Sequence, residues 1–90
     1  MEKYEISKVL TLTTSHITLE TSSWLSDEDG CSLPCYSTEH GFFVFVPGFK
    51  SHTIPSDLRS VCELATKLGC DWVQLDRDAN TIDELQKYNW

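Results

Sequence analysis

The spacing of hydrophobic and polar positions along the chain predicts three β-strands. Residues 8–13 alternate leucine and valine with threonine, which is typical of a half-buried strand. Residues 41–47 are apolar on both faces and therefore predict a central strand. Residues 71–77 place Val73 and Leu75 on one face and tryptophan, glutamine and aspartate on the other. One face of the sheet is therefore expected to be partly open to solvent.

Helical spacing predicts two helices. Over residues 55–68 the apolar positions recur at i, i+3, i+4, i+7 and i+10, and Gly69 follows as a C-terminal cap. Thr18 is suited to be the N-cap of a shorter helix that ends at about Leu25.

The remaining segments are predicted to be connections. Residues 26–40 contain Gly, Pro, Ser and a triple-acidic run, which predict a long acidic loop. Residues 81–85 predict either a returning strand or a short helical turn. The order β-α-β-α-β, with a possible fourth strand, predicts an α+β fold, a two-layer sandwich in which two helices cover one face of a small mixed sheet. The chain is short enough to form one domain, residues 1–90.

The open sheet face is a candidate binding surface if it carries aromatic side chains beside carboxylates. The central strand presents there either Phe43 and Phe45, or the alternative set Phe42, Val44 and Val46. The competing interpretation is that the acidic loop or the C-terminal tail covers this face.

The charge balance restricts the class of partner. The chain has 14 acidic and 7 basic residues, a formal net charge of −7. This balance argues against direct binding to nucleic acid or to an anionic membrane, which usually needs a basic face. It permits binding to a basic protein surface, although ordinary cytosolic proteins are often as acidic. With no secretory signal and no apolar run long enough to span a bilayer, we expect a soluble cytoplasmic protein.

The four cysteines are expected to be free thiols in the cytosol. Cys31 and Cys35 have a spacing found in zinc ligand pairs, and with His40 they form a candidate zinc set. The alternative is a pair of loop thiols without metal, and we expect no metal and no cofactor. Cys62 falls on the apolar stripe of the second helix and is expected to be a small core residue.

Asp76, Asp78 and His16 are the candidates for catalysis. Two carboxylates two positions apart on a strand share a face roughly 6.6 Å apart, a spacing that magnesium tolerates. His16 lies between a strand and a helix, where functional groups often occur, but it could instead hydrogen-bond the helix start or a neighbouring loop. No phosphate-cradling loop or recognisable nucleophile–base spacing accompanies these residues, so we expect no enzyme activity.

Two segments are strongly acidic. Residues 20–39 contain no basic residue, and residues 71–84 contain only one. Carboxylates at strand spacing could occupy the basic channel of a nucleic-acid enzyme, whereas the alternative is a solvated surface that only prevents aggregation. The candidate partner-binding residues, with the tryptophan as an aromatic anchor, are Asp27, Glu28, Asp29, Trp72, Asp76, Asp78, Asp83 and Glu84.

Four short stretches carry a resemblance to a known family: residues 15–18 (SHIT), 69–72 (GCDW), 76–78 (DRD) and 88–90 (YNW). With most of residues 10–90, they resemble a domain-of-unknown-function family of small bacterial proteins from phages, plasmids and integrated elements near antirestriction genes. That family has no established activity, so the resemblance implies a setting and no catalytic residues.

The leading hypothesis is a small acidic, non-enzymatic inhibitor from a phage or mobile element. It would bind a basic surface of a host nucleic-acid-targeting defence complex, as an anti-CRISPR or anti-restriction protein in the bacterial cytoplasm. The alternatives are a small hydrolase or nuclease-like enzyme that uses Asp76, Asp78 and His16, and a homodimeric regulatory module that self-associates through the open sheet face.

Overall fold

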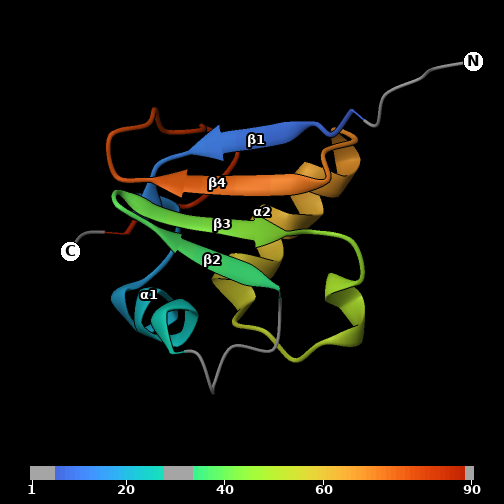
Figure 1. Cartoon of the computed structure of the whole chain (residues 1–90). Coiled ribbons are helices and arrows are strands. Elements are labelled where there is room, and N and C mark those ends of the chain that lie inside the picture. The colour runs from blue at the N-terminus through green and yellow to red at the C-terminus, as the bar shows by residue number, and fades with distance from the viewer. Residues whose placement is uncertain (1–5, 28–33, 89–90) are drawn as a thin grey trace, which may run out of the picture.

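The computed structural model describes residues 6–27 and 34–88 (Figure 1). In these ranges the chain forms four strands and two α-helices. Their bounds are β1 (Val9–Leu12), α1 (Leu19–Ser26), β2 (Cys35–Thr38), β3 (Gly41–Phe45), α2 (Ser56–Lys67) and β4 (Trp72–Asp76). Two short 3-10 turns, η1 (Thr14–His16) and η2 (Phe49–Ser51), precede the helices.

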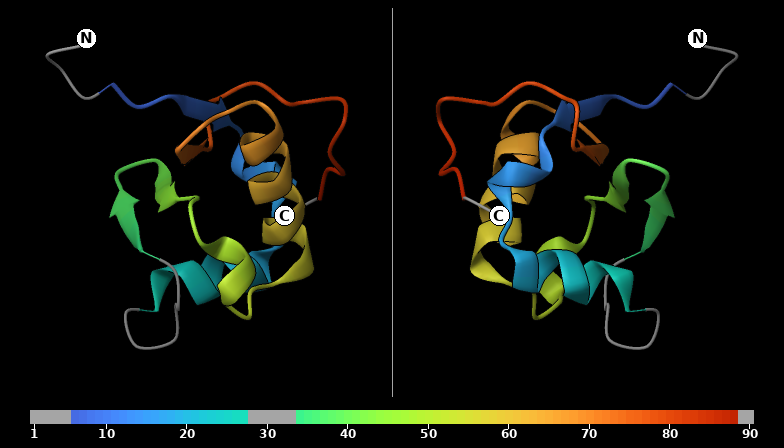
Figure 2. Two further views of the ribbon diagram at one scale, coloured as in Figure 1. Left: turned by 90° about the vertical axis from the view of Figure 1, so that its right-hand side faces the viewer. Right: turned by 90° about the vertical axis from the view of Figure 1, so that its left-hand side faces the viewer.

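The four strands form one mixed sheet in the order β1-β4-β3-β2. β1 is parallel to β4, and the other two pairs are antiparallel. Both helices lie on the same side of the sheet, with α2 behind its centre and α1 below β2 (Figures 1 and 2). The predicted α+β class, with a small mixed sheet and two helices, is confirmed.

The core lies between the sheet and α2. Leu12, Val44, Val73 and Leu75 contribute fully buried side chains from three strands. The predicted helical stripe faces them, and its buried members are Leu58, Val61, Cys62 and Ala65. Alternation along the strands therefore sends aliphatic side chains to the helix-covered face.

Local capping signals in the sequence are confirmed at both helices. The Thr18 hydroxyl accepts a hydrogen bond from the backbone N–H of Thr21 at 3.1 Å. Gly69 has a φ of +77°, in the left-handed region that favours glycine. The N–H of Cys70 donates to the Ala65 carbonyl at 2.8 Å, and that of Gly69 donates to Thr66 at 3.0 Å, the pairing of a Schellman cap.

The two helices are joined by Asp57 in the first turn of α2. Its carboxylate accepts the Thr18 N–H at 2.7 Å and the Thr21 hydroxyl at 2.8 Å. The carboxylate therefore satisfies a donor at the start of α1, where the helix dipole also favours negative charge.

The fourth strand is not where the sequence suggested. Residues 81–85 form no strand; a turn places the Leu85 N–H 3.2 Å from the Ile82 carbonyl. Instead β2 lies inside the segment predicted as a loop and pairs with β3 across a two-residue turn. Its residues are polar or exposed, so it lacks a strand's hydrophobic signature, and backbone pairing with β3 makes it a strand.

Gly41 allows β3 to approach β4 closely. A Cβ atom at this position would overlap the backbone carbonyl of Leu75 on the neighbouring strand. A residue without a side chain is therefore required where the hairpin turn meets the centre of the sheet.

Candidate functional site

The sheet face opposite the helices carries the candidate binding surface. In cross-strand register, Val9, Trp72 and Phe45 form one row across this face. The next row contains Thr11, Gln74, Phe43 and Tyr36. We call the surface made by Tyr36, Phe43, Phe45 and Trp72 the aromatic face. The structure thus selects Phe43 and Phe45 from the two sets that the sequence allowed.

Trp72 is the centre of the aromatic face. Its ring centroid lies 4.8 Å from that of Phe45, in an edge-to-face arrangement, and 4.9 Å from that of Phe43. Tyr36 on the edge strand completes the group at 6.3 Å. Each of the two closer pairs contributes about 0.5–1.5 kcal/mol beyond its buried area, so Trp72, Phe43 and Phe45 hold one another in a preferred geometry.

No described element covers the aromatic face. Tyr36 is 63% exposed and Val9 at the opposite edge is 42% exposed. The C-terminal segment runs back on the helix side, where the Tyr88 N–H donates to the Ser15 carbonyl at 2.7 Å (Figure 2). An uncovered group of large apolar side chains is a common feature of interaction surfaces.

Beyond the aromatic rows the same face becomes polar. Asp76 follows Trp72 and Gln74 on the outward side of β4, opposite Gly41. The Asp76 Oδ1 accepts the backbone N–H of Asp78 at 2.9 Å, so this carboxylate also holds the turn after β4. Asp76 is therefore a carboxylate that lies on the same side of the sheet as the aromatic face.

The other predicted acidic residues do not gather there. Glu84 lines a cavity of about 110 Å³ with Asp57 and Ser60 of α2, on the helix side of the sheet. Asp83 belongs to the same returning segment, and Asp27 follows α1 in the helix layer. Glu28 and Asp29 lie outside the described residues. Of the acidic residues that the structure describes, Asp27, Asp83 and Glu84 therefore do not form one array with Asp76 and Trp72.

Tyr36 was absent from the residues proposed from sequence. It lies in the segment taken for a loop, so its place beside Trp72 depends on the β2–β3 pairing. The available signal was the run Cys35–Thr38, which contains the strand-favouring residues tyrosine and threonine.

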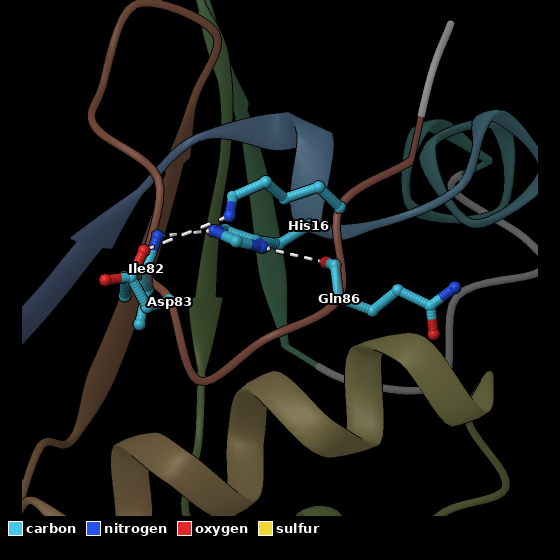
Figure 3. Close-up of polar contacts among 5 residues, drawn as sticks. His16, Ile82, Asp83 and Gln86 are labelled. Carbon is cyan, nitrogen blue, oxygen red and sulfur yellow. Dashed lines mark hydrogen bonds and ion pairs between the residues drawn. The ribbon is translucent and has the colours of Figure 1, made fainter.

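His16 is a buried structural residue (Figure 3). Its Nε2 accepts the backbone N–H of Ile82 at 2.8 Å, which assigns the ring proton to Nδ1. The protonated Nδ1 donates to the Gln86 carbonyl at 2.9 Å. Both ring nitrogens are therefore occupied, and the geometry leaves neither free to act as a base beside Asp76 and Asp78. The alternative expectation, a histidine that bonds neighbouring backbone, fits this position.

The cysteines do not assemble a metal site in the described part of the chain. No group of three or more potential ligands lies together in residues 6–27 and 34–88, and Cys31 lies outside those ranges. The Cys35 sulfur lies 3.8 Å from the Leu25 carbonyl oxygen. Cys62 is fully buried, and burial raises the pKa of its thiol from 9.0 to about 11.

Comparison with known protein families identifies the family of the chain. A model described as the C-terminal domain of a family of unknown function, DUF5983, matches residues 9–90. The chain belongs to this family. The DUF5983 match includes all four strands, so the aromatic face and the helix layer lie within the family domain. Neither a curated protein nor a solved structure gives a significant match.

The helices of this DUF5983 domain are short. Within the described ranges, neither is long and apolar enough to cross a membrane.

Proposed function

We propose that this chain is a non-enzymatic binding protein whose aromatic face docks on a basic surface of a partner protein. The observation that carries the proposal is the cluster of four aromatic rings on a sheet face that no described element covers. Rigid aromatic side chains are the residues that most often dominate protein–protein binding energy.

The charge on this surface favours a protein partner over nucleic acid. Aromatic sheet faces also stack the bases of single-stranded nucleic acids, but those sites add cations that follow the phosphate backbone. None of the four strands contains a lysine or an arginine. With a net charge of −7, the protein would repel a polyanion and attract a cationic surface.

Arginine is the partner side chain that fits the surface best. A guanidinium group stacks on aromatic rings and also pairs with a carboxylate through a fork of N–H donors. Trp72 and Phe43 supply ring faces, and Asp76 supplies a carboxylate on the same outward side of β4, four residues beyond Trp72. One or more arginines of the partner, inserted between the rings and Asp76, would contact both the aromatic rings and the carboxylate.

The biological partner that we propose is a host protein that handles nucleic acid for defence. This part of the proposal rests on the family resemblance and on charge: proteins that bind nucleic acid present the basic surfaces that this chain would seek. The protein would then act in the bacterial cytoplasm as an anti-CRISPR or anti-restriction inhibitor encoded by a phage or mobile element. Its negative charge would speed encounter with such a target.

The test is affinity capture from host lysate with tagged wild-type protein, followed by nucleic-acid competition on the purified partner. We expect a basic nucleic-acid-binding protein that is retained at low salt, released at high salt and displaced by its own nucleic acid. Trp72→Leu keeps an apolar side chain but removes the ring, and it should weaken the complex at least about tenfold, as for a binding hot spot. Asp76→Asn should weaken it less and reduce its salt dependence.

Asp83→Asn is the matched control, because it removes the same charge from the helix side of the molecule. Equal weakening by Asp76→Asn and Asp83→Asn would contradict docking through the aromatic face and favour net charge alone. Retention of the partner by Trp72→Leu at wild-type affinity would exclude the face. If no partner is retained and light scattering gives a dimer that Trp72→Leu dissociates, the homodimer hypothesis replaces this one.

A further inference from the structure

A polar pocket lies on the helix side of the hairpin turn, apart from the aromatic face. It lies between α1, the β2–β3 hairpin and the residue that follows β4, and its volume is about 330 Å³. Hydroxyl groups line it from three elements: Thr14 in η1, Ser22 and Ser26 in α1, and Ser37 and Thr38 in β2. This volume is at the lower end of the range for small-molecule sites.

His40 brings an unsatisfied nitrogen to the pocket lining. Its Nδ1 is buried and has no hydrogen-bond partner among the described residues. The other ring nitrogen, Nε2, lies 4.0 Å from the carboxylate of Glu39, whose side chain is 87% exposed. Buried polar atoms without partners are rare in proteins. The His40 side chain is 42% exposed, so a rotation of the ring would bring this nitrogen to a bound molecule.

Arg77 contributes to the pocket lining a positive charge that has no ion-pair partner among the described residues. Within the described ranges, its guanidinium makes no hydrogen bond and no ion pair. The Arg77 N–H donates to the His40 carbonyl at 2.9 Å, which fixes the two residues beside each other at the pocket. A guanidinium in this state presents its N–H donors to an incoming oxyanion.

We propose that this pocket binds a phosphate monoester, with the phosphate group held by Arg77 and His40. A planar carboxylate is satisfied by the guanidinium fork alone, whereas a phosphate has oxygens that point in several directions. The hydroxyls of Ser22 and Ser37 make no hydrogen bond within the described ranges and can serve those oxygens from two sides. The remaining volume accommodates a small organic group. This inference does not depend on docking through the aromatic face.

The test is an NMR titration of isotopically labelled protein with three probes: adenosine monophosphate, inorganic phosphate and adenosine. We expect saturable shifts with the first two probes, concentrated at residues 37–41 and at Arg77, and none with adenosine. Arg77→Gln should weaken binding of adenosine monophosphate at least about tenfold, because a hydrogen bond from a charged donor is lost. Lys67→Gln removes an equal charge from the exposed side of α2 and should leave the affinity for adenosine monophosphate unchanged.

The Arg77→Gln spectrum outside the pocket must match the wild type, which separates lost binding from lost structure. His40→Asn is a second variant that should also weaken binding while it leaves the backbone pairing with Arg77 intact. The proposal is overturned by the absence of saturable shifts in the wild type, or by equal affinities in Arg77→Gln and Lys67→Gln. Shifts of the same size with adenosine would also overturn it, because the phosphate would then not be the recognised group.

Discussion

The two faces of the sheet are made by alternate residues of the same strands, yet they have different compositions. Along β4, Val73 and Leu75 are fully buried against the helices, while Trp72 and Gln74, which alternate with them, remain half-buried. The covered face is mainly aliphatic, and Phe42 is the buried aromatic side chain that β3 contributes to it. The opposite face, which no described element covers, is aromatic, and its rings contact one another. Large rigid rings can thus order a surface that has no covering layer and remain available to a partner.

The largest effect should come from the covered face. Leu75→Ala removes a fully buried side chain and should lower the free energy of unfolding by about 2–5 kcal/mol. Urea denaturation followed by circular dichroism measures this loss. Gln74→Ala, its neighbour on the opposite face, should cost less than about 1 kcal/mol. Similar losses in the two variants would mean that the two faces of the sheet contribute equally to stability.

His16 should be the next most sensitive position, because it ties the returning C-terminal segment to the covered side. His16→Ala leaves the Ile82 N–H and the Gln86 carbonyl without their partner and should cost about 1–3 kcal/mol. Hydrogen exchange should accelerate at the Ile82 amide before the strands respond. His52→Ala removes an imidazole from the loop before α2 and should leave that amide protected; equal acceleration in both variants would argue against the tie.

The pH dependence of the unfolding free energy should show whether the Cys62 thiol is shielded from water on the covered side. Burial raises the pKa of this thiol from 9.0 to about 11, so the folded state holds the proton more tightly than the unfolded state. The resulting stability is present below pH 9 and is lost as the pH rises through about 11. In Cys62→Ala the alkaline fall in unfolding free energy should be shallower. The Cys62 thiol should also react slowly with Ellman's reagent in native wild type, and fast reaction would show that water reaches the helix interface.

The smallest effect on stability should come from the edge of the aromatic face. Tyr36 is largely exposed and contacts Trp72 only at the distant 6.3 Å separation, so Tyr36→Ala should change the unfolding free energy by about 0.5 kcal/mol or less. The same variant should still weaken partner capture. A loss of several kcal/mol in unfolding free energy would mean that the rings stabilise the fold, and would argue against a docking role.

Local features of the fold could be predicted from sequence because neighbouring residues determine them. The Thr18 cap, the apolar stripe of α2 and the glycine after it depend on contacts within a turn or two. β2 was not predicted, since no side chain of Cys35–Thr38 is buried, and the strand-favouring tyrosine and threonine become a strand only by pairing with β3. Its strand state is a tertiary property.

The candidate site was predicted only in part for a similar reason. Because residues 41–47 are apolar on both faces, only the register with β4 assigns Phe43 and Phe45 to the uncovered side. Asp76 and Trp72 share that side through strand alternation, which the sequence does reveal. Asp83 and Glu84 leave it because the chain after β4 turns back towards His16, and no local pattern encodes that return.

During synthesis β1 leaves the ribosome long before its neighbour in the sheet. Thr11 and Gln74, which face each other across the β1–β4 pair, are 63 residues apart in the chain. The β2–β3 hairpin and α2 can form earlier from short-range contacts, whereas closing such a distant pair is slow. Trp72, the centre of the aromatic rings, emerges on that last strand. A chain that has not yet emerged as far as Trp72 therefore cannot display the assembled rings, and a target encounters this surface only after β4 has joined the sheet.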